Sequence, residues 1–187
     1  MKKYGWLMAT APILGVIMFV CMIMVMSGAV SLTMNGFAVD TNGQLYIGQA
    51  NEIMVLKDGE CVKTLSPKTS RGYAFTIENG EQIVLSTSTT VFIMDLDGAV
   101  ISQYPDEGTQ VFNRLKNPKT FVDIHGTEYT RKNVWGRPYI YKDGIEVYSM
   151  PLRDYAVGVT MVVVGLLAAL SGLAAAAQRF HDLSGKV

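Results

Sequence analysis

Apolar residues are concentrated at the two ends of the chain, and charged residues are concentrated between them. Residues 4–39 contain no charged side chain, and residues 155–177 contain none either. A helix of about 20 apolar residues crosses the roughly 30 Å of hydrocarbon in a bilayer. The pattern therefore predicts a membrane protein in which two transmembrane α-helices, residues 6–30 and 155–177, flank an all-β extracytoplasmic domain, residues 31–154.

The first apolar run also has features of a cleaved signal peptide. Lys2 and Lys3 precede it, and the small residues of Ser27–Ala29 resemble a cleavage site. However, the run far exceeds the apolar region of about 7–15 residues that is usual in a signal peptide. A retained anchor is the favoured interpretation. A lipoprotein site is disfavoured, because Val20 rather than a small residue precedes Cys21.

Basic residues near the apolar runs predict the orientation of the chain. The two N-terminal lysines precede the first run, and Arg179 and Lys186 follow the second. Short basic flanks stay in the cytoplasm. We therefore expect a multi-pass protein of the plasma membrane, with residues 1–5 and 178–187 in the cytoplasm and the middle domain outside. Arg153, on the outer side, is a mild contrary signal.

The middle domain contains three stretches with the same order of features. Each begins with Phe, continues to an early turn that ends in Gly, and has a later Asp-Gly pair. Such pairs between apolar runs are strong signals for hairpins with type I′ turns, in which both central residues have positive φ. Each stretch therefore predicts a four-stranded antiparallel meander. The three repeats are Phe37–Leu65, Phe75–Tyr104 and Phe121–Met150, and their turn pairs are Asn42-Gly43 and Asp58-Gly59, Asn79-Gly80 and Asp97-Gly98, and His125-Gly126 and Asp143-Gly144.

Short motifs within the repeats point to a known architecture. The first repeat contains "FAVDTNGQLYI" and "EIMVLKDGE", and the second contains "VFIMDLDG". These motifs resemble the repeats of the NHL and YWTD families, which form six-bladed β-propellers. The resemblance implies that each four-stranded unit is a blade, and it carries over no catalytic motif. The third repeat departs from the pattern, because His125 stands at its first turn.

The second repeat contains a run, Val91–Met94, that is apolar without alternation. Such a run predicts a strand that is covered on both faces. We therefore place the second repeat at the centre, between the first and the third. In the third repeat the shorter run Tyr139–Tyr141 is flanked by Arg137 and Lys142, as expected for an end blade with one uncovered face.

Three blades do not close a propeller, because 4–8 blades are usual. A second copy or a different chain could complete the ring, or the strands could form a sandwich or an arc. The favoured arrangement is an arc or half propeller that pairs with a second copy or with another membrane protein. The segment Pro105–Pro118 is charged and contains two prolines, so we expect it to leave the sheet and to be available for contacts.

Composition excludes several classes of function. The 16 basic and 16 acidic residues give a net charge of zero, so nucleic acid is not an expected partner. Cys21 and Cys61 fall in different predicted regions, which disfavours a disulfide, and the chain has no Cys/His cluster. "DLDG" at Asp95–Gly98 and His125 in "DIHGTE" are interpreted as turns rather than as metal ligands. We expect no metal and no cofactor.

Aromatic and basic residues are interleaved in the segment Glu128–Lys142. Tyrosine, tryptophan and arginine dominate binding hot spots, so this segment predicts a partner-binding patch. Packing of the tyrosines within strands, or anchoring of the tryptophan at the lipid headgroups, would explain the same residues. The candidate contact residues are Tyr129, Arg131, Trp135, Arg137 and Tyr139.

The second apolar run has small residues at regular spacing. Gly158, Gly165 and Gly172 are seven residues apart, and Ala169 lies four residues after Gly165. Small side chains let helices approach closely, so these residues predict a face that packs on the first helix or on a second subunit. Ordinary use of glycine and alanine in membrane helices is the alternative.

Together these features predict a non-enzymatic binding module that is anchored in the lipid bilayer. The middle domain would contact a protein or a ligand as an accessory or sensory subunit of a membrane complex. A structural homo-oligomeric scaffold of the envelope is the first alternative, and a propeller-type hydrolase or lyase is the second. The sequence lacks the common catalytic motifs, which disfavours an enzyme.

Overall fold

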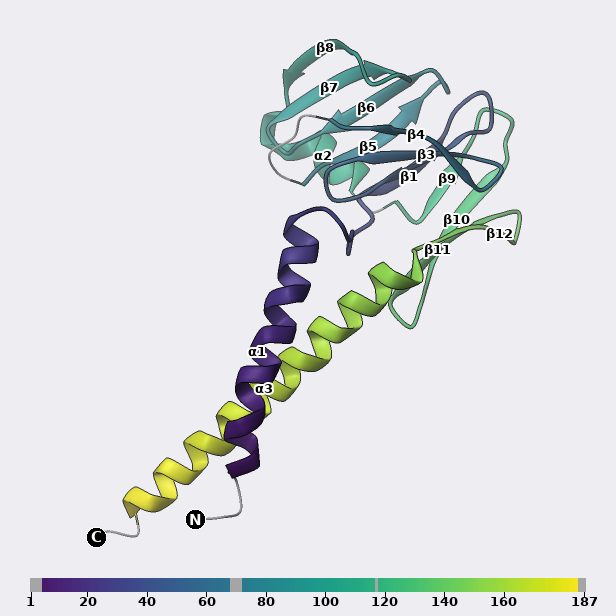
Figure 1. Cartoon of the computed structure of the whole chain (residues 1–187). Helices are drawn as coiled ribbons and strands as arrows, with labels where there is room; N and C mark the ends of the chain where they lie inside the picture. The colour runs from purple at the N-terminus through teal and green to yellow at the C-terminus, as the bar shows by residue number, and fades with distance from the viewer. Residues whose placement is uncertain (1–4, 68–71, 117, 185–187) are drawn as a thin grey trace. The chain divides into compact units, whose positions relative to one another are not determined.

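The computed structural model divides into two compact units (Figure 1). The residues that it describes are 5–67, 72–116 and 118–184. The helical unit combines the chain before Ser31 with the chain after Pro151, and the β domain is Ser31–Pro151. Parts of the predicted cytoplasmic tails, residues 1–4 and 185–187, lie outside the described residues.

The helical unit contains two apolar helices that pack on each other, α1 (Gly5–Met26) and α3 (Leu152–Ser184). Outward-facing side chains of both are large and apolar, including Phe19 at 64% exposure and Leu170 at 62%. Both helices therefore leave large apolar side chains uncovered within this unit.

The prediction of two membrane-spanning helices is wrong. Among the described residues, only Leu152–Ala174 of α3 is long and apolar enough to cross a bilayer. The described apolar part of α1, Pro12–Met26, rises about 22 Å, which is less than the hydrocarbon thickness of about 30 Å. The predicted first span, residues 6–30, also extends beyond the end of α1 at Met26. Residues 27–30 form turns and bends instead.

The β domain contains three four-stranded antiparallel sheets, and each is a meander of consecutive strands (Figure 1). The three predicted four-stranded repeats are thereby confirmed. Sheet 1 comprises β1 (Gly36–Val39), β2 (Leu45–Gly48), β3 (Ile53–Lys57) and β4 (Glu60–Leu65). Sheet 2 comprises β5 (Ala74–Glu78), β6 (Gln82–Ser86), β7 (Thr90–Asp95) and β8 (Val100–Pro105). Sheet 3 comprises β9 (Thr120–Val122), β10 (Glu128–Val134), β11 (Arg137–Lys142) and β12 (Ile145–Ser149).

Three of the six predicted turn pairs have positive φ at both residues, as type I′ hairpins require. These pairs are Asp58-Gly59, Asn79-Gly80 and Asp143-Gly144. Trp135-Gly136, between β10 and β11, is a further turn of this kind that was not predicted. An exposed tryptophan is an unusual residue for the left-handed region, so turn propensity did not indicate it.

Each of the other three predicted pairs lies in a loop in which the side chain of an aspartate accepts hydrogen bonds from backbone N–H groups. Asp40 Oδ1 accepts hydrogen bonds from the N–H groups of Asn42 at 2.9 Å and Gln44 at 2.8 Å. The N–H of Gly43 donates to the Asp40 carbonyl, and of the two residues in the predicted pair only the glycine has positive φ. This is the three-residue alternative to a type I′ hairpin. The same loop forms at Asp95, in "DLDG", and at Asp123, before His125.

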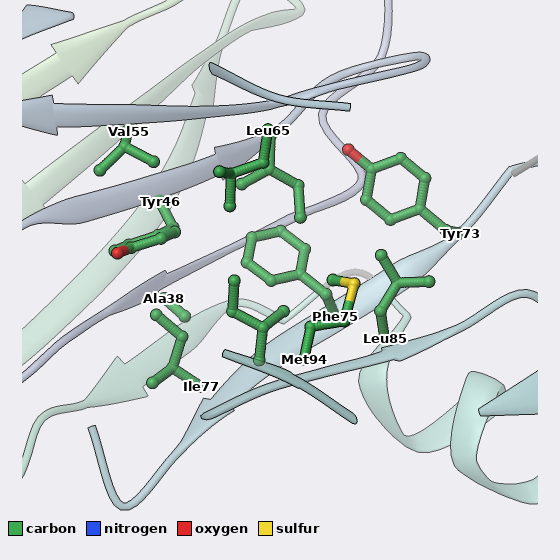
Figure 2. Packing of buried hydrophobic residues seen from close by; sticks show 11 residues of the cluster. Ala38, Tyr46, Val55, Leu65, Tyr73, Phe75, Ile77, Leu85 and Met94 are labelled. Atoms are coloured by element: carbon green, nitrogen blue, oxygen red, sulfur yellow. The ribbon is translucent and has the colours of Figure 1, made fainter. Parts of the chain in front are cut away.

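Sheet 1 lies between the other two sheets. On one face, Tyr46 and Val55 pack against Phe75 and other residues of sheet 2 (Figure 2). On the opposite face, Ile47 packs in a cluster with Ile140 of sheet 3. Strands β1 and β2 are accordingly buried at every position. The prediction that the second repeat is central is therefore wrong.

The outer face of sheet 2 is covered by the segment that follows it. This segment leaves the sheet, as predicted, and forms η1 (Glu107–Thr109) and α2 (Gln110–Leu115). Leu115 packs in a cluster with Val91, whereas Met94 belongs to the cluster shared with sheet 1. Strand β7 is thus apolar without alternation because a sheet covers one face and a helix covers the other. A strand face that packs against a helix and one that packs against a sheet both need apolar residues, so the sequence pattern does not tell them apart.

Candidate functional site

The interleaved aromatic and basic residues form one hairpin, β10–β11. Cross-strand pairs run from Tyr129 opposite Lys142 to Val134 opposite Arg137. Because side chains alternate between the two faces of a strand, neighbours in this segment point in opposite directions. The predicted patch is therefore divided between two faces and a tip.

The outward face of the hairpin has aromatic rings at its centre and cations on either side. The rings of Tyr139 and Tyr141 stack with centroids 6.3 Å apart. Lys132 Nζ lies 5.1 Å from the centroid of Tyr141, and Arg137 Cζ lies 5.3 Å from the centroid of Tyr139. Both distances are within the range of cation–π attraction. We call these four residues the outward ladder.

Arg137 is the most firmly held member of the outward ladder. Its Nε donates a 2.7 Å hydrogen bond to the carbonyl oxygen of Met150, and its other nitrogens donate to the hydroxyls of Tyr139 at 3.3 Å and Ser149 at 3.4 Å. The N–H of Met150 also donates to the carbonyl of Pro138 at 3.0 Å. The hairpin and the last residues of the β domain therefore form one hydrogen-bonded structure.

Tyr129 and Arg131 lie on the inward face and contact the rest of the domain. Tyr129 is buried in the cluster between sheets 1 and 3, and Lys142 lies over its ring. Arg131 donates a hydrogen bond to the carbonyl oxygen of Met34 at 3.4 Å. Burial lowers the pKa of the Arg131 guanidinium from its ordinary value, but an arginine still keeps its charge. These two residues are placed to hold the sheets together.

Trp135 stands at the tip of the hairpin and is 91% exposed. Its neighbour Val134 is 44% exposed, so two apolar side chains are adjacent at the tip. The structure thus brings together Arg137 and Tyr139 of the predicted patch and separates them from Tyr129 and Arg131. It adds Lys132 and Tyr141, which lie in the predicted segment but were not among the candidate contact residues. A period-2 count along the two strands on either side of Trp135-Gly136 would have identified both.

The predicted packing residues of α3 have different surroundings. Gly158 and Gly165 are half-buried, whereas Ala169 and Gly172 are exposed. A methyl group placed on Gly165 would lie 3.7 Å from Met18 Cε of α1. A methyl group on Gly172 would have nothing within 4 Å. Of these residues, Gly165 therefore lies beside α1, whereas Gly172 faces open space.

Two clefts lie where sheets 1 and 3 meet. The first, of about 300 Å³, is lined by Leu45, Leu56, Tyr129, Lys142 and Glu146. The second, of about 470 Å³, adjoins it along β12 and includes Cys61. Within the described ranges, no three His, Cys, Asp or Glu side chains are grouped closely enough to hold a metal ion.

No protein-family model and no curated protein matches this chain. Among solved structures, the chain is similar to a protein of unknown function from Bacteroides caccae. The sequences are 11% identical, the TM-score is 0.33, and the match covers 64% of this chain. The chain spans about half of that protein, 46% of its length. At this level of similarity, a functional assignment depends on the residues of this chain alone.

Proposed function

We propose that this chain is a non-enzymatic binding protein that is anchored in a membrane by α3. The β domain would contact a partner protein in the same membrane, as an accessory or sensory subunit of a complex. The outward ladder is the observation that carries the proposal. It places two stacked tyrosines between an arginine and a lysine on the side of sheet 3 that faces away from sheet 1.

The chemistry of the outward ladder suits protein recognition. Tyrosine and arginine are enriched at the centres of interfaces, because each combines a large apolar area with a polar group. The hydrogen bonds of Arg137 to Met150 and Ser149 hold its side chain in place before a partner binds. A side chain that is already fixed loses little conformational entropy on binding.

The proposed anchor is the segment Leu152–Ala174 of α3. Its 23 residues would rise about 34 Å as a helix, enough to cross the hydrocarbon layer. Only 6% of its most apolar window is buried, unlike the core helix of a soluble protein. Arg179 and Lys186 follow it, which favours a cytoplasmic C-terminus at the plasma membrane and a β domain on the other side.

We also propose that the three sheets are blade-like units of the kind that the NHL and YWTD motifs suggest. The first strands of the three sheets are neighbours, since β1 lies beside both β5 and β9. In a propeller, blades are likewise arranged around a central axis. The initial phenylalanine of each repeat supports this arrangement, because Phe37 and Phe75 are buried and Phe121 packs against both of their clusters.

The test is affinity purification of the full chain from native membranes after chemical cross-linking. We expect a membrane protein to be recovered with the wild-type chain and to be lost with the double variant Tyr139→Ala/Tyr141→Ala. The matched control is Tyr104→Ala, which removes a tyrosine that is 45% exposed on sheet 2. Equal recovery with both variants, or no partner with the wild type, would contradict the proposal.

A second candidate function is self-association as a homo-oligomeric scaffold, and the edge strand β8 favours it. Every residue of β8 is exposed, and none is charged. The other outer edge strands carry charges that discourage pairing, Glu60 and Lys63 on β4 and Glu146 on β12. Light scattering of the detergent-solubilised chain tests this candidate. An oligomer that Ile101→Lys reduces to monomers supports it, and a monomeric wild type contradicts it.

A further inference from the structure

We propose that the tip of the β10–β11 hairpin, residues 133–137, docks onto the anionic lipid headgroups of the bilayer. The proposal rests on the proposed function in one respect, namely that α3 is a membrane anchor. It assigns the tip to lipid, together with the two cations of the outward ladder, Lys132 and Arg137, and leaves the ladder tyrosines, which lie further along β11, to a protein partner.

Covalent connectivity places the tip close to the start of the anchor. Arg137, at the base of the tip, donates its hydrogen bond to the carbonyl of Met150. Only Pro151 separates Met150 from Leu152, the first residue of the candidate span. Two residues of chain reach at most about 7 Å. Whatever the relative orientation of the two units, Arg137 therefore lies within a short reach of the residue at which α3 would enter the bilayer.

The apolar residues of the tip suit the headgroup region. Trp135 is 91% exposed and Val134 is 44% exposed. Tryptophan is enriched at membrane–water interfaces, because its indole ring is apolar and its N–H is polar. Trp135 lies in the type I′ turn, with φ of 54°, and is followed by Gly136 with φ of 82°. Trp135 and Val134 therefore both lie at the end of the two-stranded β10–β11 hairpin.

The positive charge of the hairpin favours lipids with anionic headgroups. The hairpin, residues 128–142, contains four basic side chains and one acidic side chain, Glu128, at the end far from the tip. Arg131 is turned toward sheet 1, so Lys132 and Arg137 are the cations on the same face as Val134. Basic residues next to a membrane span attract anionic headgroups over about a Debye length. The tip thus combines an apolar wedge with adjacent positive charge.

The experiment uses the full chain reconstituted into vesicles of phosphatidylcholine, with and without phosphatidylglycerol. Trp6→Phe leaves Trp135 as the only tryptophan, since the chain has two. Its fluorescence reports contact with lipid through the emission wavelength, quenching by brominated lipids and quenching by aqueous iodide. The matched control carries Trp6→Phe, Trp135→Phe and Val62→Trp, which moves the single tryptophan to an exposed position on sheet 1.

We expect phosphatidylglycerol to shift the Trp135 emission to shorter wavelength, to make brominated lipid an effective quencher and to reduce iodide quenching several-fold. The control tryptophan should stay accessible to iodide in both vesicles. Lys132→Gln/Arg137→Gln should abolish most of the effect of phosphatidylglycerol. Lys57→Gln, an exposed lysine at the end of β3, should leave it unchanged.

Iodide quenching of Trp135 that is equal in the two kinds of vesicle would overturn the proposal. Vesicle flotation after an alkaline wash shows whether the anchor has failed as well. If the chain floats with the vesicles while Trp135 stays in water, only the docking of the tip is wrong. If the chain is washed off, the anchoring by α3 is wrong and the docking that depends on it is overturned too.

Discussion

The hydroxyl of Ser86 donates a 2.7 Å hydrogen bond to Asp106 Oδ2, and both side chains are buried. The same carboxylate accepts hydrogen bonds from the N–H groups of Val111 at 3.0 Å and Phe112 at 2.8 Å. One aspartate therefore joins the end of β6 to the first turn of α2. This link holds α2 on the outer face of sheet 2, where Leu115 of α2 packs in a buried cluster with Val91.

Asp106 should make the β domain sensitive to acid. Desolvation raises the pKa of this carboxyl, but the hydrogen bonds from Val111, Ser86 and Phe112 outweigh it and hold the pKa below the ordinary value of 3.8. A pKa that is lower in the folded state stabilises the fold above the unfolded value, and that stability is lost as the pH falls through the folded value. We expect Asp106→Asn to lower the melting temperature by several degrees at neutral pH and to reduce its loss below about pH 4.

Melting of the detergent-solubilised chain as a function of pH is the measurement. The control is Asp58→Asn, because asparagine tolerates the positive φ of this turn residue. The control should keep the acid sensitivity of the wild type. The same steep loss in Asp106→Asn would show that other carboxyls cause it.

Gly80 should be the most sensitive of the turn glycines, because a neighbouring loop packs directly against it. A methyl group there would lie 2.5 Å from Thr41 Cγ2 and 3.0 Å from the Thr41 nitrogen, and φ is +70°. Gly59 is the matched control, with φ of +85° and nothing within 4 Å. Gly59→Ala should cost about 1–2 kcal/mol for the left-handed backbone alone. Gly80→Ala should cost a further ~1–3 kcal/mol for the overlap.

Urea unfolding of the two variants gives this difference directly. The N–H of Thr41 also donates to the Gly80 carbonyl at 3.1 Å, so the turn and the loop cannot separate without losing a hydrogen bond. An equal loss of unfolding free energy in the two variants would mean that Thr41 can move away from residue 80 at little energetic cost.

The ring of Phe75 should be able to pack in the core only because residue 48 is a glycine. A methyl group on Gly48 would lie 2.8 Å from Phe75 Cε1, and Phe75 is 1% exposed. We expect Gly48→Ala to destabilise the domain by about 1–3 kcal/mol through overpacking. Phe75→Leu should cost less in the Gly48→Ala background than in the wild type, because the smaller side chain relieves the overlap. Gly72→Ala, with nothing within 4 Å, is the control and should be nearly neutral. Additive costs in the double variant would contradict this account.

Local features of the fold could be predicted from the sequence, because short-range chemistry determines them. Turn pairs such as Asn79-Gly80 fix where a chain reverses, and the apolar runs between them fix the strands. The three meanders follow from these signals alone. The loops closed by Asp40 and its counterparts were located correctly and assigned the wrong turn type. An aspartate side chain that accepts hydrogen bonds from the loop can reverse the chain direction, as two residues with positive φ also do.

The arrangement of the sheets could not be predicted, because burial does not specify what covers a strand. Val91 is buried by a helix and Met94 by a sheet, yet the two residues look alike in sequence. The residues of the predicted binding patch are divided between two faces for a related reason. Tyr129 and Tyr139 are both aromatic residues in one segment, but alternation directs one into the core and leaves the other in the outward ladder.

Gly165 should tolerate a small side chain and reject a large one, because α1 lies beside it. Its added methyl group would meet Met18 Cε at 3.7 Å, an ordinary van der Waals contact, so Gly165→Ala should be nearly neutral. Gly165→Leu needs space that Met18 occupies, and it should destabilise the helical pair by about 1–3 kcal/mol. Met18→Ala in the same chain should recover part of that loss. Gly172→Leu changes an open position and should have little effect. Thermal melting in detergent compares the four variants. If Gly172→Leu proved as costly as Gly165→Leu, contact with α1 at Gly165 would not explain the cost, and the packing face would have to be placed elsewhere on α3.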